Sequence, residues 1–167
     1  MSSSSAVVLV GPMGVGKTTV GKKLAKPLGL PFVDTDALIV KRYGDITNIF
    51  DTLGEAQFRV FEEEAVLETL ASRSVVATGG GAVLSERTRE ALAVATVVYL
   101  STDGRHISGR IKNGKRPLLK SGVGDWRSIY ESRRALYEQV ADITVDTSDA
   151  SLANTIAFIT KELEKFD

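Results

Sequence analysis

The chain has 167 residues, of which 43% are hydrophobic and 25% are charged, values typical of one globular domain with a sizeable core. Twenty-one basic and twenty-one acidic residues give a formal net charge of zero, which excludes a global attraction to nucleic acid or to acidic membranes. No cysteine is present, and the longest nearly apolar run is shorter than the ~20 residues that span a bilayer. We therefore expect residues 1–167 to form a single cytoplasmic domain without nucleic-acid or membrane partners.

Five short runs rich in β-branched residues predict β-strands, each buried on both faces as in a parallel sheet. In chain order these runs are 6–10, 31–34, 74–78, 96–100 and 142–146. Segments with helical spacing alternate with them, most clearly at 56–70 and 152–163. Alternating strands and helices predict a doubly wound α/β fold, in which ligands bind at the carboxyl ends of the strands.

The stretch GPMGVGKT, residues 11–18, matches the phosphate-binding pattern G-x-x-x-x-G-K-[ST] directly after the first predicted strand. Its glycines let backbone amides wrap phosphate oxygens, the lysine reaches the outer phosphates, and the threonine hydroxyl can hold magnesium. A glycine-rich turn without function does not explain lysine and threonine at this spacing. The motif predicts a nucleoside triphosphate site formed by Gly14, Val15, Gly16, Lys17, Thr18 and Thr19.

Two acids follow the second predicted strand. Residues two apart on an extended strand point the same way, so Asp34 and Asp36 are expected to face one pocket at the mouth of the phosphate-binding loop. One could hold a magnesium-bound water while the other orients or deprotonates a substrate hydroxyl. The alternative is that Asp34 or Thr35 simply caps a helix that begins near Ala37.

Two further segments carry candidate substrate contacts. In the predicted helix 56–70 and just before it, Glu55, Glu62 and Glu63 lie three or four residues from Arg59 and can hold it in one rotamer, which suits an arginine to gripping a carboxylate. A solvated salt-bridged face is the alternative. The three glycines of TGGGAV, residues 78–83, follow a strand and allow either a close approach of backbone to ligand or a tight turn.

The stretch 112–125, KNGKRPLLKSGVGD, combines basic residues with glycines and few apolar side chains, so we expect a mobile flap. Arg110 and Arg116 bracket its start, and an arginine near a flap is a natural partner for nucleotide phosphates. Arg133 and Arg134 follow on a helical stretch. Either could be a solvated surface residue.

Taken together, these pieces resemble the shikimate kinase family, a branch of the P-loop kinases related to nucleoside monophosphate kinases. The resemblance runs from about Val7 to Ile159 and rests on GPMGVGKTT, DTD, GEAQFRVFE, GGG, RPLL and R-x-x-LY, in this order. It implies a five-stranded parallel sheet in the order 2-3-1-4-5, a mobile lid at about 112–125 and a monomer. It also implies transfer of a phosphoryl group from ATP, with Mg²⁺, to the 3-hydroxyl of shikimate, a step of aromatic amino-acid biosynthesis.

The resemblance also implies roles for individual residues. Thr18 and Asp34 would hold magnesium, Asp34 through water, and the catalytic residues would be Lys17, Asp36 and Arg116. The shikimate pocket would consist of Asp36, Arg59, Gly79, Gly80, Gly81 and Arg133. Nucleotide contacts beyond the phosphate-binding loop would come from Arg110, along the adenine, and from Arg116. The family often has proline where this chain has Ala135, so the choice of Arg133 over Arg134 depends on helix register.

Two alternatives stay open from the sequence. Another small-molecule kinase, such as a gluconate kinase, would share the loop and flap but has less need for two carboxylate-binding arginines beside GGG. A non-catalytic, nucleotide-dependent regulatory module would usually lack the lysine, the acid pair or an acceptor-site arginine, and all of these are present here.

Overall fold

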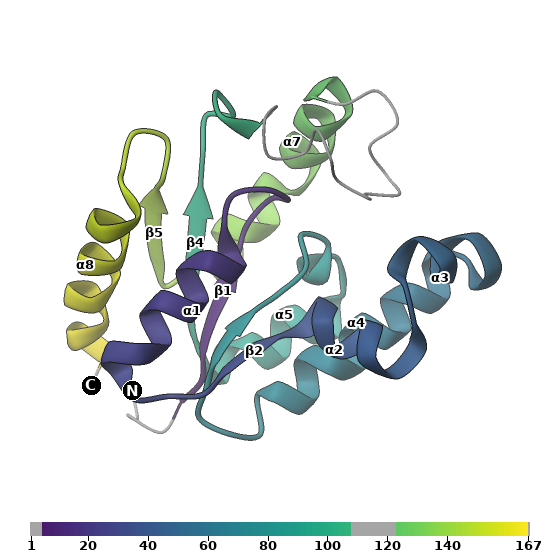
Figure 1. The fold of residues 1–167 in the computed structure, drawn as a ribbon, viewed down its shortest axis with the longest axis horizontal. Helices are drawn as coiled ribbons and strands as arrows, with labels where there is room; N and C mark the ends of the chain where they lie inside the picture. Colours follow the sequence, from purple (N-terminus) through teal and green to yellow (C-terminus); the bar gives the residue numbers. More distant parts are fainter. Residues whose placement is uncertain (1–4, 108–122, 167) are drawn as a thin grey trace.

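The computed structural model describes residues 5–107 and 123–166. Five strands form one parallel sheet in the order β2-β3-β1-β4-β5 (Figure 1). They are β1 (Val7–Val10), β2 (Phe32–Asp34), β3 (Val75–Ala77), β4 (Thr96–Ser101) and β5 (Ile143–Asp146). The five runs read from the sequence are thereby confirmed as strands, to within one or two residues at each end.

Helices cover both faces of this sheet, and the segments 56–70 and 152–163, which had the clearest helical spacing, are confirmed as helices. The α-helices are α1 (Lys17–Leu28), α2 (Thr35–Tyr43), α3 (Ile46–Leu53), α4 (Glu55–Thr69), α5 (Glu86–Ala91), α7 (Val123–Val140) and α8 (Leu152–Leu163). Short 3₁₀ turns are η1 (Ala82–Leu84), η2 (Leu92–Val94) and η3 (Glu164–Phe166). Because α7 begins at Val123, the last three residues of the expected flap belong to a helix, and the rest of that flap lies outside the described residues.

The two faces of the sheet bury two separate cores, because successive side chains of a strand point to opposite sides. Val7 and Leu9 of β1 pack with α1 and α8, on the side that faces the viewer in Figure 1. Val8 and Val10 pack on the opposite side with residues of α4, η1, η2 and α7. A third, smaller cluster joins α2, α3 and α4 beside β2.

The prediction that every strand is buried on both faces is wrong for β5, and β2, the other edge strand, is only half-buried. Ile143 and Val145 are buried against the α1 and α8 side, whereas Thr144 and Asp146 are exposed. As the last strand in the sheet order, β5 is covered on one face only, and its sequence alternates accordingly. Among residues 5–107 and 123–166, no helix is both long and apolar enough to cross a membrane.

Candidate active site

The loop between β1 and α1 has the backbone geometry of a phosphate-binding loop. Gly14 and Gly16 have φ angles of 79° and 103°, a left-handed region that glycine enters without steric cost. Gly16 is the N-cap of α1, so the first amides of this helix are directed toward the loop. A helix N-terminus of this kind attracts phosphate through its N–H groups and its dipole.

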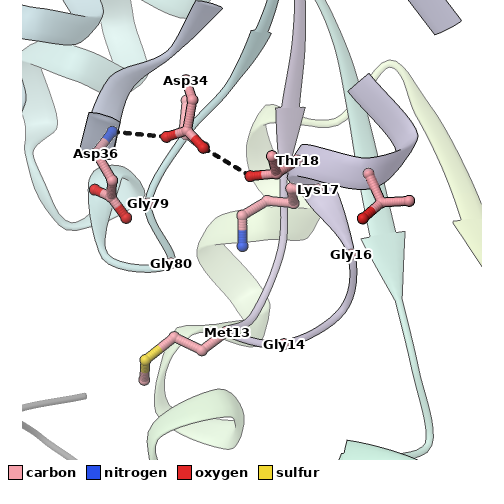
Figure 2. A pocket seen from close by; sticks show the side chains of 11 residues that line it. Met13, Gly14, Gly16, Lys17, Thr18, Asp34, Asp36, Gly79 and Gly80 are labelled. Carbon is pink, nitrogen blue, oxygen red and sulfur yellow. Dashed lines mark hydrogen bonds between the residues drawn. The ribbon is translucent and has the colours of Figure 1, made fainter. Parts of the chain in front are cut away.

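Lys17, the first residue of α1, is the principal cation of this loop and is 9% exposed. Its Nζ atom donates hydrogen bonds to the carbonyl oxygens of Gly11, at 2.7 Å, and Pro12, at 2.9 Å. The ammonium group therefore lies under the curve of the loop, where a bound anion would meet it (Figure 2).

Asp34 links the phosphate-binding loop to the start of α2. Its Oδ2 atom accepts a hydrogen bond of 2.7 Å from the Thr18 hydroxyl. Its Oδ1 atom accepts from the backbone N–H groups of Asp36, at 2.9 Å, and Ala37, at 3.2 Å, and so caps the helix (Figure 2). The sequence left open whether Asp34 caps a helix or lies at the nucleotide loop. The carboxylate of Asp34 does both, one oxygen bonding to Thr18 of the loop and the other capping α2.

The expectation that Asp34 and Asp36 point the same way along an extended strand is wrong. β2 ends at Asp34 and α2 begins at Thr35, so Asp36 belongs to the first turn of a helix. Thr35 is fully buried, whereas Asp34 and Asp36 both line the cavity at the mouth of the phosphate-binding loop. The common pocket is therefore observed, but a strand-to-helix turn produces it.

This cavity has a volume of about 220 Å³ and lies at the carboxyl ends of β1, β2 and β3. Its lining residues come from the phosphate-binding loop, the acid pair and the glycine turn after β3. They are Met13, Gly14, Gly16, Lys17, Thr18, Thr19, Asp34, Asp36, Thr78, Gly79 and Gly80. Phosphate-binding backbone and an acidic side chain thus face the same space.

None of the glycines 79–81 has a positive φ angle, so Gly79 and Gly81 are required by space rather than by backbone conformation. A Cβ atom on Gly79 would lie 2.7 Å from Glu62 Oε2 and 2.8 Å from Asp36 Oδ1. A Cβ atom on Gly81 would lie 2.6 Å from Cζ of Arg59. The sequence suggested a close approach of backbone to a ligand, whereas the close approach found here is to charged side chains of the protein itself.

Arg59 is held by two carboxylates of its own helix, α4. Its Nη1 atom donates to Glu62 at 2.8 Å, and its Nε and Nη2 atoms donate to Glu55 at 3.3 and 3.2 Å. Glu63, which the spacing also assigned to Arg59, instead accepts from Ser85 at 2.6 Å and pairs with Arg87 at 3.3 Å. Two of the three expected partners are confirmed, and the third faces α5.

Glu62 is the most deeply buried acid of this region, with 3% of its surface exposed. Burial raises the pKa of Glu62 above its ordinary range, although the positive charge of Arg59 opposes this shift. The nearby charge of Asp36 raises it further, and that of Arg133 lowers it. Two acids and two arginines therefore influence one another around the glycine turn.

The second arginine comes from α7, and the structure separates the two candidates there. Arg133 is 6% exposed, and its Nη1 atom lies 3.7 Å from the position that a Cβ on Gly80 would occupy. The side chain of Arg134 is 43% exposed and pairs with Glu131 at 3.0 Å. Only Arg133 of this pair lies beside the glycine turn.

Two more cavities lie near the predicted site residues, and the second of them shares Gly16 and Thr19 with the central cavity. The first, about 210 Å³, lies between α4 and η1 and is lined by Arg59, Gly81 and neighbouring residues. The second, about 330 Å³, lies between α1 and the segment after β5. Its lining residues are Val15, Gly16, Thr19, Val20, Thr147, Ala150, Leu152 and Thr155. Val15 and Thr19, expected at the nucleotide, thus border a space next to the phosphate-binding loop.

Two predicted nucleotide contacts, Arg110 and Arg116, lie outside the described residues. Conversely, sequence reasoning gave no site role to Trp126 and Tyr137 of α7. Trp126 Nε1 donates to the carbonyl oxygen of Met13 at 2.7 Å, and the Tyr137 hydroxyl donates to that of Gly80 at 2.5 Å. An i, i+4, i+7, i+11 stripe from Trp126 through Tyr130 and Arg133 to Tyr137 was the available indication that these side chains share one buried face.

The parallel sheet, the phosphate-binding loop at the end of its central strand and the adjoining acid pair define a P-loop kinase fold. The family described as shikimate kinase matches residues 13–164 of this chain. The chain belongs to the shikimate kinase family.

Individual relatives agree with this assignment. The chain is 42% identical over 165 residues to shikimate kinase of Francisella tularensis subsp. novicida, with 93% of each chain covered. It is 40% identical to that of Mannheimia succiniciproducens, covering 100% of this chain and 99% of the relative. The structure of Acinetobacter baumannii shikimate kinase in complex with shikimate superposes with a TM-score of 0.93 at 34% identity, covering 99% of this chain and 96% of that one.

Proposed function

We propose that the cavity beside the phosphate-binding loop is where this chain transfers the γ-phosphoryl group of ATP to the 3-hydroxyl of shikimate, the activity of its family. The observation that carries the proposal is the convergence of Arg59, Arg133 and Asp36 on the glycine turn. These three charged groups come from three different helices and lie beside Gly81, Gly80 and Gly79, respectively, and Gly79 and Gly80 line the same cavity as the phosphate-binding loop. Two cations and one acid suit an acceptor that has both a carboxylate and a hydroxyl group.

The donor would occupy the loop and the neighbouring threonine-lined cavity. The amides of Gly14, Val15 and Gly16 would bind phosphate oxygens, and Lys17 would neutralise the outer phosphates. The adenine base of ATP would lie in the 330 Å³ cavity between α1 and the segment after β5, which Thr19 borders together with other residues. Arg110 and Arg116, which lie outside the described residues, would complete the nucleotide contacts.

Mg²⁺ fits the donor set at the loop. Thr18 and Asp34 bring a hydroxyl and a carboxylate oxygen within 2.7 Å of each other, the hard oxygen ligands that Mg²⁺ prefers. Among the described residues, no group of three or more His, Cys, Asp or Glu side chains could hold a metal by itself. Such a sparse protein set suits an ion that keeps several waters and binds substrate phosphates. When bound, the ion would neutralise charge on the β- and γ-phosphoryl oxygens.

The acceptor residues would divide binding from proton transfer. Arg59 and Arg133 would bind the shikimate carboxylate, since a guanidinium group matches a carboxylate in shape and charge. Asp36 would hydrogen-bond the 3-hydroxyl and take its proton as the hydroxyl oxygen bonds to the γ-phosphorus. The bond between that phosphorus and the bridging oxygen breaks in the same step, and ADP leaves with the electron pair. Gly79, Gly80 and Gly81 would leave room for these groups.

The proposal is tested by measuring ADP release with magnesium and ATP in three parallel reactions, containing shikimate, gluconate or no acceptor. Turnover well above background with shikimate alone is the expected result. Faster turnover with gluconate would leave the donor assignments in place and overturn those of the acceptor pocket. Equal background rates in all three reactions, with ATP bound, would favour a regulatory module instead.

We also propose that the chain works as one cytoplasmic kinase domain and as a monomer. A zero net charge and a cysteine-free sequence support the first part. Light scattering of the purified protein with ATP, magnesium and shikimate present would test whether it is a monomer, with a mass near 17.9 kDa as the expected result.

A further inference from the structure

One buried face of α7 contributes three side chains that lie beside the loops of the site, Trp126, Arg133 and Tyr137. Trp126, Tyr130, Arg133 and Tyr137 follow one another at intervals of four, three and four residues, and all four are buried. The hydrogen bonds from Trp126 and Tyr137 end on carbonyl groups of the phosphate-binding loop and the glycine turn, respectively. Arg133 is thus flanked along the helix by residues tied to both loops.

The hydroxyl of Tyr137 occupies a central position in this arrangement. It donates a hydrogen bond of 2.5 Å to the carbonyl oxygen of Gly80, and the guanidinium group of Arg133, one helical turn earlier on α7, lies close enough to interact with it electrostatically. Tyr137 is 1% exposed, and its ring stacks on Tyr99 with a centroid distance of 5.3 Å. Packing therefore leaves the hydroxyl little freedom, and its neighbours are a backbone carbonyl of the turn, to which it is bonded, and the charged side chain expected to bind the acceptor.

The buried hydroxyl remains a neutral donor over the physiological range. Burial raises the pKa of Tyr137 to about 12, and the nearby charge of Arg133 only partly opposes the shift. A neutral hydroxyl can donate to the Gly80 carbonyl and accept from Arg133 at the same time. Phenylalanine, which keeps the ring and its packing, can do neither.

We propose that Tyr137 is a positioning residue for the acceptor pocket. Its hydroxyl fixes the position of the Arg133 guanidinium relative to the glycine turn. The inference rests on the proposed acceptor role of Arg133. Tyr137 itself lines none of the three cavities described above, so it acts through Gly80 and Arg133 rather than on the substrate. Without its hydroxyl, the buried carbonyl of Gly80 loses its donor and Arg133 gains rotamer freedom.

The test is steady-state kinetics of Tyr137→Phe, with separate KM values for shikimate and ATP. We expect the KM for shikimate to rise roughly 5- to 30-fold, because a buried polar group loses its hydrogen-bond partner. The KM for ATP should stay within about twofold of the wild-type value. Tyr99→Phe is the matched control, because its hydroxyl bonds with that of Tyr130, at 2.6 Å, rather than with the site. This control is expected to lower the melting temperature without moving either KM.

A double-mutant cycle with Arg133→Ala separates positioning from general stability. If Tyr137 acts through Arg133, the effect of Tyr137→Phe on the KM for shikimate becomes much smaller in the Arg133→Ala background. Fully additive effects, an unchanged KM in Tyr137→Phe, or the same shift in Tyr99→Phe would each overturn the proposal. The wild-type acceptor comparison is done first, and the cycle then uses the acceptor that is turned over. A wrong acceptor and a wrong role for Tyr137 therefore give different results.

Discussion

The donor and acceptor halves of the site are built in opposite ways. The phosphate-binding part of the donor half is one continuous stretch, residues 11–19, whose ligands are mainly backbone amides at the start of α1. The acceptor half takes side chains from α2, α4 and α7, which are far apart in the sequence and meet at the glycine turn. A local backbone motif can serve many phosphate ligands, whereas an assembly of buried charges suits one shape of acceptor. Specificity in this chain is therefore expected to depend on the long-range half.

The largest effect is expected where the two halves meet. Asp36→Asn removes the proposed base but keeps the size of the side chain, and turnover should fall by ~10²–10⁴-fold. ATP binding, measured by calorimetry in the presence of magnesium, should change little because the phosphate-binding loop is intact. Near-normal turnover would remove Asp36 from the mechanism.

Arg133→Ala should act on the acceptor half alone. Losing one partner of a buried, hydrogen-bonded charge pair costs about 3 kcal/mol, so the KM for shikimate should rise roughly 100-fold. Arg134→Ala is the matched control, since this neighbour is exposed and its ion pair with Glu131 contributes little. Equal effects of the two substitutions would mean that the buried position of Arg133 has no part in binding.

Gly81→Ala tests whether space around Arg59 matters. The new methyl group would lie 2.6 Å from Arg59 Cζ, so the guanidinium has to move. We expect a rise of about tenfold in the KM for shikimate, equivalent to about 1.4 kcal/mol, with the KM for ATP unchanged. Gly80→Ala, whose Cβ would lie 3.3 Å from the Met13 side chain, is the milder companion. A larger effect at Gly80 than at Gly81 would contradict the explanation.

The smallest effect concerns the pH dependence of stability. Because the pKa of Glu62 is raised on folding by burial, its contribution to stability is complete below its ordinary pKa of 4.5 and is lost as the pH rises through the folded value. The melting temperature of the wild type minus that of Glu62→Gln should therefore fall with rising pH and then level off. A change on the order of a few °C is expected. Glu55→Gln, which removes an exposed partner of Arg59, is the control. If its melting-temperature difference changed with pH in the same way, the effect would come from loss of a partner of Arg59 and not from the burial of Glu62.

Sequence patterns predicted the parts of the fold that depend on local chemistry. The apolar runs gave the strands, and the spacing of G-x-x-x-x-G-K-[ST] identified the donor loop with its lysine and threonine. The strand order was implied by family resemblance, since alternation of strands and helices is compatible with other orders. The one-sided burial of β5 follows from its place at the sheet edge, and the alternation of apolar and polar residues in Ile143–Asp146 was the available sequence signal for it.

The acceptor half was predicted less completely, for a physical reason. Helical spacing identified Glu62 as a partner of Arg59, but it assigned Glu63 as well, because spacing alone does not say which face a neighbouring helix covers. The bond from Tyr137 to Gly80 joins residues 57 positions apart through a backbone carbonyl. Every residue has a backbone carbonyl, so a hydrogen bond to one requires no particular residue type at the acceptor position. Such a contact therefore cannot be recognised in the sequence.

The central place of β1 in the sheet has a consequence for folding while the chain is being synthesised. Val7 pairs with Val75 on one side and with Thr96 on the other, so this first strand cannot complete its ladder until about a hundred residues have been made. At ~5–20 residues per second, the apolar stretch VVLV waits for several seconds as an unpaired edge, a form prone to aggregation. Because β1 pairs with both β3 and β4, we expect the nucleotide loop at its end to become ordered only after these two strands have been made. Capture of ATP by a nascent chain would therefore report that the central sheet has formed.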